Sequence, residues 1–107
     1  MRAVLGPLLL GWVALTTCLG CASYQAGRLY AEGSAVISTD PAQAIDKLAR
    51  AAELAPHASE IHNHLGLAYA EAGRPSEALA AFERAVAVDC DNQAAQYNLA
   101  RARAENP

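Results

Sequence analysis

The chain has 107 residues, of which 53% are hydrophobic and 6% aromatic, and its formal net charge is −3. This length limits the protein to one domain with a small core, and the many alanines favour closely packed helices over a β-sandwich or barrel. No basic stripe is available to neutralise phosphates, so nucleic acid is not an expected partner.

Residues 1–20 have the pattern of an export signal. Arg2 supplies a positive charge, residues 3–15 are apolar apart from glycine and proline, and small residues surround two cysteines in "TTCLGCAS". This order is typical of a segment removed after export. It resembles a bacterial lipoprotein signal, in which a cysteine receives diacylglycerol and becomes the mature N-terminus. The resemblance implies that residues 1–20 are removed and that Cys21 carries the lipid.

Three alternatives remain open for this segment. Cys18 could be the acceptor in place of Cys21, although Thr17 would then precede the cysteine, which fits the pattern less well. An ordinary signal could be cut after Ala22. An uncleaved anchor would have about the length of a bilayer span, although Pro7 weakens it as a permanent helix. Each alternative exports the rest of the chain.

Residues 24–37 are the first candidate helix after the signal. Apolar residues from Leu29 to Ile37 form a stripe, but Gly33 lies in the middle, at a cost of roughly 1 kcal/mol relative to alanine. We therefore expect residues 21–33 to be a lipidated N-terminus followed by a tether or a frayed helix.

The remainder of the chain repeats itself with a period of 34 residues. A shift of this length places similar residues on one another: Pro41 on Pro75, Ala44 on Ala78, Leu48 on Phe82 and Ala51 on Ala85. Fixed self-similarity of this length is typical of helical repeat proteins.

Start and stop signals divide this region into helices. Asp40 is expected to cap a helix over residues 41–54. Gly73 suits the left-handed end of a helix over residues 59–72, and the next helix is predicted over residues 75–88. Antiparallel helical hairpins are the expected result.

Two spaced motifs give this region a family resemblance. The pattern His62-x2-Leu65-Gly66-x2-Tyr69, followed by Ala78-x3-Phe82-x2-Ala85, resembles a tetratricopeptide repeat. His62 stands where tryptophan is commonest, and Cys90 stands where proline is commonest. The best repeat spans residues 59–92, and partial repeats span residues 24–58 and 93–107. The resemblance implies an all-α fold over residues 34–107, a short α-solenoid of about two and a half repeats.

The histidines do not predict a metal site. His62 and His64 are two residues apart, which places their side chains about 200° apart around a helix. We interpret His62 as a packing substitute for tryptophan and place His57 and His64 at the surface, with a metal ion as the alternative.

Cys90 is interpreted as a turn residue, with an intermolecular disulfide or a catalytic thiol as alternatives. The chain has no glycine-rich phosphate loop, Gly-x-Ser-x-Gly motif or paired carboxylates, so we expect no enzymatic activity. No cofactor is expected, and the only covalent group predicted is the lipid on Cys21.

The family resemblance also implies a groove for a protein or peptide, lined mainly by the first helix of each repeat. The side chains expected to line it are Asn63, Leu67, Ala70, Glu71, Tyr97, Asn98 and Arg101. Amide and aromatic groups suit a peptide ligand, although the same residues could form an ordinary solvated helix face. The Lys and Asn arrangement by which some relatives bind a C-terminal carboxylate is missing.

Two functions follow as hypotheses. The first is a lipid-anchored adaptor or scaffold that binds proteins in envelope assembly, pilus or secretion systems. The second is a structural envelope component that completes its repeat stack in a homo-oligomer. Because Ala22 and Ser23 follow Cys21, with no Asp there, the expected location is the outer membrane facing the periplasm. A soluble periplasmic protein and an N-terminally anchored protein are the alternatives.

Overall fold

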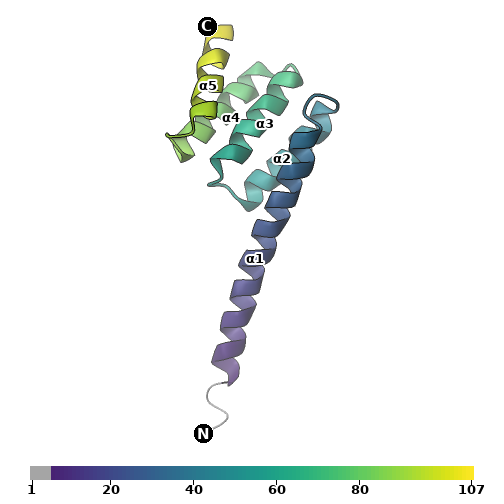
Figure 1. The fold of residues 1–107 in the computed structure, drawn as a ribbon, viewed down its shortest axis with the longest axis vertical. Coiled ribbons are helices and arrows are strands. Elements are labelled where there is room, and N and C mark those ends of the chain that lie inside the picture. The colour runs from purple at the N-terminus through teal and green to yellow at the C-terminus, as the bar shows by residue number, and fades with distance from the viewer. Residues whose placement is uncertain (1–5) are drawn as a thin grey trace.

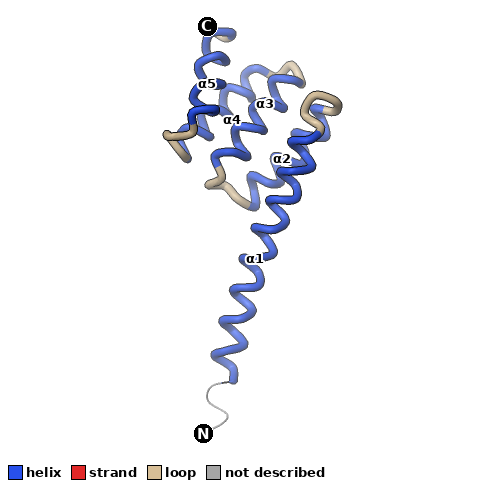
Figure 2. The backbone as a smooth tube through the Cα atoms, in the orientation of Figure 1, coloured by secondary structure: helices blue, strands red, loops and turns tan. Residues whose placement is uncertain are grey.

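A computed structural model of the chain describes residues 6–107, with side chains from residue 20 onward. It contains α1 (Gly6–Ala35), α2 (Pro41–Leu54), α3 (Ser59–Glu71), α4 (Pro75–Val88) and α5 (Gln93–Glu105). Figure 2 shows helices joined by short turns, and no strand occurs within residues 6–107. The predicted all-α fold is confirmed. Residues 1–5 of the predicted signal lie outside the described residues, as does the side chain of Cys18.

Successive helices run antiparallel and pack side by side (Figure 1). α1 pairs with α2, α3 pairs with α4, and α5 packs against α4. Because α3 also contacts α5 and lies beside α1, the helices α1, α3 and α5 form one layer and α2 and α4 form the other. The result is a short α-solenoid, from which the N-terminal half of α1 projects well beyond the other helices (Figure 1).

The predicted start of α2 is confirmed by its cap. The side chain of Asp40 accepts a hydrogen bond from the backbone N–H of Gln43 at 3.1 Å, and Pro41 begins the helix. Such a cap satisfies one of the backbone donors that a helix leaves free at its N-terminus.

The turn between α3 and α4 follows the predicted stop and start signals. Gly73 has φ of +71°, a conformation that glycine adopts without steric cost. The N–H of Gly73 donates to the carbonyl of Ala70, and the N–H of Arg74 donates to that of Tyr69. These two bonds form a Schellman motif, which satisfies the last carbonyls of α3.

The core is built largely from small side chains. Nine of the fifteen buried hydrophobic residues among those described are alanine, and Phe82 and Leu48 are the largest fully buried side chains. Small residues at helix contacts let the backbones approach closely, so most of the buried surface comes from helix packing around a few large anchors.

Each of these two large side chains packs against a glycine of the partner helix. A Cβ added to Gly66 would lie 2.5 Å from the Phe82 ring, and a Cβ added to Gly33 would lie 2.8 Å from Cγ of Leu48. Gly66 therefore lies at a close approach of two helices, where a larger side chain would force them apart. Gly33 is not merely a costly interruption of α1, because it makes the same contact in the first hairpin.

α1 is helical through residues 24–35, and Ala26, Leu29 and Gly33 are buried. The helix ends at Ala35, two residues earlier than the predicted segment, and the chain then turns through Val36 and Ile37. Both side chains stay half-buried against the core cluster around Leu48. They therefore contribute to packing from a turn and not from a helix.

Candidate partner-binding groove

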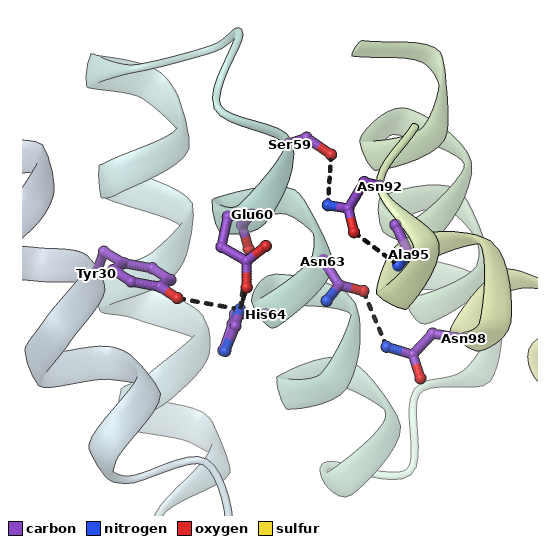
Figure 3. A network of polar contacts seen from close by, with 8 residues as sticks. All are labelled: Tyr30, Ser59, Glu60, Asn63, His64, Asn92, Ala95 and Asn98. Atoms are coloured by element: carbon purple, nitrogen blue, oxygen red, sulfur yellow. Dashed lines mark hydrogen bonds and ion pairs between the residues drawn. The ribbon is translucent and has the colours of Figure 1, made fainter. Parts of the chain in front are cut away.

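The start of α5 is fixed by a polar contact with α3 (Figure 3). The side chain of Asn92 accepts a hydrogen bond from the N–H of Ala95 at 3.0 Å and caps the helix. Its amide donates to Oγ of Ser59 at 2.9 Å, and that hydroxyl donates to the carbonyl of Ala85 at 2.8 Å. The cap of α5, the first residue of α3 and the end of α4 are thus joined, and this sets the position of α5 beside α3.

A second polar contact joins the middle of these two helices. Nδ2 of Asn98 donates to Oδ1 of Asn63 at 2.9 Å, and the two residues are 9% and 2% exposed. Buried amides of this kind need a partner, because an unpaired polar group costs free energy in an apolar interior. Asn63, which was predicted to line the groove, is therefore used to hold α3 against α5 and is not presented to a ligand.

The contact between α1 and α3 occupies the position in the repeat stack that is equivalent to the contact between α3 and α5. It is made by aromatic and charged side chains, whereas the other is made by amides. The rings of Tyr30 and His64 meet edge to face, with centroids 5.0 Å apart, and Tyr30 Oη lies 3.5 Å from Nδ1 of His64 (Figure 3). The carboxylate of Glu60 lies 3.4 Å from the same nitrogen. Burial and the charge of Glu60 raise the pKa of Tyr30, so its hydroxyl stays protonated.

A pocket of about 350 Å³ opens between the C-terminal end of α3, the first half of α4 and the second half of α5. Its volume is at the lower end of the range found for ligand pockets. Apolar groups supply much of its wall, while amide and charged groups stand among them. The lining residues are Ala70, Gly73, Pro75, Ala78, Phe82, Asn98, Arg101, Ala102, Glu105 and Asn106.

The two charged side chains at this pocket, Arg101 and Glu105, form only a weak, exposed ion pair. Nε of Arg101 lies 3.8 Å from Oε1 of Glu105, and both side chains are about half exposed or more. An exposed pair of this kind contributes at most about 1 kcal/mol, so either group can turn toward a ligand. The pocket can therefore accept an apolar side chain at its base and bind polar backbone groups beside it.

The structure brings three of the predicted groove residues together in the pocket, namely Ala70, Asn98 and Arg101. Leu67 is half-buried against the cluster around Phe82, and Glu71 is exposed at the end of α3. Tyr97 is 68% exposed on α5 and does not line the pocket.

The remaining pocket residues were missed by sequence reasoning. Glu105 and Asn106 lie at the end of the last helix, where the repeat pattern assigns no ligand position. The sequence predicts Gly73 only as the end of a helix and Pro75 only as a repeat position. A prediction based on the first helix of each repeat cannot identify them, because they meet Arg101 only through the packing of α5 on α4.

The histidines have structural contacts. His62 is half-buried and its Nε2 donates to the carbonyl of Pro56 at 2.8 Å. His57 is exposed, whereas His64 is half-buried and not at the surface as predicted, because Tyr30 covers it. Within the described part of the chain, no three His, Cys, Asp or Glu side chains are grouped so that they could hold a metal ion.

The two cysteines with described side chains are exposed and carry free thiols. Cys21 lies in α1, and Cys90 lies in the turn between α4 and α5. Residues 6–107 contain no helix that combines the length and the apolar character needed to cross a bilayer.

Comparison with known families identifies the class of protein. A tetratricopeptide repeat family model matches residues 34–95 and, in a second overlapping match, residues 68–107. The chain belongs to the tetratricopeptide repeat family. Repeats of this family mediate protein–protein interactions and are typically non-catalytic scaffolds. No curated protein matches the chain.

Proposed function

We propose that the protein is a lipid-anchored adaptor that binds a protein partner in the pocket between α3 and α5. In this proposal residues 1–20 are removed, Cys21 carries diacylglycerol, and the repeat domain faces the periplasm from the outer membrane. The partner belongs to an envelope assembly, pilus or secretion system.

The observation that carries the proposal is the composition of the pocket. Phe82 and several alanines give it an apolar base, while Asn98 and Arg101 supply polar groups at its side. A peptide needs both features, because its side chains require apolar contacts and its backbone requires hydrogen-bond partners. The exposed thiol of Cys21, five residues before the first buried residue among the described side chains of α1, is compatible with lipid attachment.

Partner binding can be tested by site-specific photo-crosslinking in cells. A photoreactive amino acid at position 101 should give a crosslinked adduct with a protein partner. The matched control is position 84, because Arg84 is also exposed but lies on α4, outside the pocket. Adducts from position 84 alone would contradict the proposed site.

The anchor is tested separately by the intact mass of the protein extracted from membranes. The expected mass is that of a chain beginning at Cys21 with its lipid, and Cys21→Ser should lose the lipid. A chain beginning at Ser23 without lipid, or one that retains Met1, would contradict the anchor but leave the pocket proposal standing. Concentration-dependent dimers without any other partner would favour the self-associating component instead.

A further inference from the structure

The residues between the proposed lipid and the folded body leave almost no tether. Cys21 is followed by four residues, and the next residue, Ala26, is already 3% exposed in the contact of α1 with the body. Five helical steps span about 7 Å, and even a fully extended chain of this length spans about 17 Å. The body therefore stays close to whatever surface holds the lipid.

Two of the three exposed large hydrophobic residues among those described lie at this same end of the molecule. Tyr24 is 75% exposed on α1, one turn after Cys21, and Leu54 is 37% exposed at the last position of α2. Leu54 is one turn beyond Ala51, which packs with Leu29 of the antiparallel α1. Tyr24 and Leu54 are thus at the end of the body from which the N-terminal half of α1 projects (Figure 1).

The pocket lies at the opposite end. Helices α1, α3 and α5 run in the same direction, and Figure 1 shows their C-terminal ends on the side away from the N-terminus. The pocket is formed by Ala70 near the end of α3, the turn at Gly73, the first half of α4 and the second half of α5. The anchor and the pocket therefore mark the two ends of the body.

We propose that the end carrying Tyr24 and Leu54 rests in the headgroup region of the phospholipid bilayer, so that the pocket faces away from the membrane. This inference rests on the proposed lipid at Cys21. A short, helical connection holds that end against the bilayer, and tyrosine is a residue that favours the interface between lipid and water. A protein partner then reaches the pocket from the aqueous side.

The test uses the lipidated full chain, its lipid confirmed by intact mass, in vesicles of phosphatidylethanolamine and phosphatidylglycerol that contain a headgroup spin label. A polarity-sensitive fluorophore is placed on His57→Cys, in the turn beside Leu54, with Cys90→Ser to leave one reactive thiol. The matched variant carries the fluorophore on Ser76→Cys, at the pocket end, in the same background. We expect quenching at position 57 to be several-fold stronger than at position 76, and equal quenching would overturn the inference.

Two further variants separate the tether from the apolar contact. A flexible insertion of 15 Gly and Ser residues between Ser23 and Tyr24 has a reach of roughly 20 Å and should abolish the difference between the two sites. Tyr24→Ser combined with Leu54→Ser should reduce quenching at position 57, whereas Tyr97→Ser, an exposed tyrosine on α5, should leave it unchanged. A difference that survives the insertion undiminished would contradict the role of the short tether, and no effect of the double variant would contradict the contact of Tyr24 and Leu54 with the headgroups. A mass without lipid is a different outcome, because it refutes the anchor itself.

Discussion

The two helical hairpins make the same central contact with different residues and different spacing. In the second hairpin Gly66 packs against the ring of Phe82, and in the first Gly33 packs against Leu48. The anchors are 34 residues apart, but the glycines are 33 apart, and α1 ends sooner after its glycine than α3 does. Each repeat therefore preserves a contact between helices even where its spacing shifts by one residue.

Truncating Phe82 or Leu48 gives the largest expected loss of stability and tests whether the first hairpin is as firmly packed as the second. Phe82→Ala should lower the free energy of unfolding by about 3–5 kcal/mol and Leu48→Ala by about 2–5 kcal/mol, because both side chains are fully buried. Urea unfolding followed by circular dichroism measures both changes. A loss below about 1 kcal/mol for Leu48→Ala would show that α1 and α2 are not packed in solution.

Adding a methyl group to each glycine sharpens the comparison. Gly66→Ala should cost about 1–3 kcal/mol, because three atoms of the Phe82 ring, which is 1% exposed, would lie within 2.9 Å of the new Cβ. Gly33→Ala should cost less than Gly66→Ala, because only one atom, Cγ of Leu48 at 2.8 Å, would lie closer than 3.0 Å to the new Cβ, whereas three atoms of the Phe82 ring would do so at Gly66. Urea unfolding measures both variants, and amide hydrogen exchange locates the effect in one hairpin.

A rescue experiment serves as the control for this difference. Phe82→Leu gives the second hairpin the smaller anchor of the first, so Gly66→Ala should cost less in that background than in the original chain. Equal costs in the two backgrounds would mean that the ring of Phe82 is not the obstacle.

The same comparison explains what the sequence could predict. Asp40, Gly73 and the start of α4 were predicted correctly, because capping and turn signals act over a few neighbouring residues. Gly33 was misinterpreted, because a fixed shift of 34 places it opposite Leu67 and not opposite Gly66. Only the packed structure shows that α1 ends two residues after Gly33 whereas α3 ends five residues after Gly66, and that the longer turn from Val36 to Asp40 makes up all but one residue of this difference.

The candidate groove was less predictable than the fold for a related reason. Helical periodicity indicates which side of α3 faces α2 and α4, but it does not indicate which polar side chains of α3 pair with those of α5. Asn63 finds its partner in Asn98, 35 residues later, and so becomes part of the interior. Exposed and paired amides look alike in a sequence, and their burial depends on how α5 is positioned by Asn92.

The contact between α3 and α5 and the contact between α1 and α3 can also be compared, with a smaller expected change in stability. Asn98→Ala should cost about 1–3 kcal/mol, because it leaves the buried oxygen of Asn63 without its donor. His64→Ala should cost less than about 1 kcal/mol, because Tyr30 remains half-buried and its hydroxyl can bond to water. Thermal unfolding compares the two variants, and a larger loss for His64→Ala would show that the aromatic contact is the stronger one.

The smallest expected effect is a pH dependence confined to the first hairpin. Nζ of Lys47 donates to Oε2 of Glu32 at 2.6 Å, linking α2 to α1, and Arg28 lies 3.4 Å from the other oxygen. The hydrogen bond from Lys47, and then its charge, hold the pKa of Glu32 below its usual value of 4.5. Since the folded state binds this proton less readily than the unfolded state, the contribution is fully present above pH 4.5 and is lost as the pH falls through the lowered pKa.

Glu32→Gln should therefore flatten the acid side of the stability curve, measured by urea unfolding at successive pH values below 4.5. Lys47→Met should flatten it to a similar extent, and the double variant should add little, because both changes remove one interaction. Additive effects would mean that the two groups stabilise the hairpin independently, through neighbours other than each other.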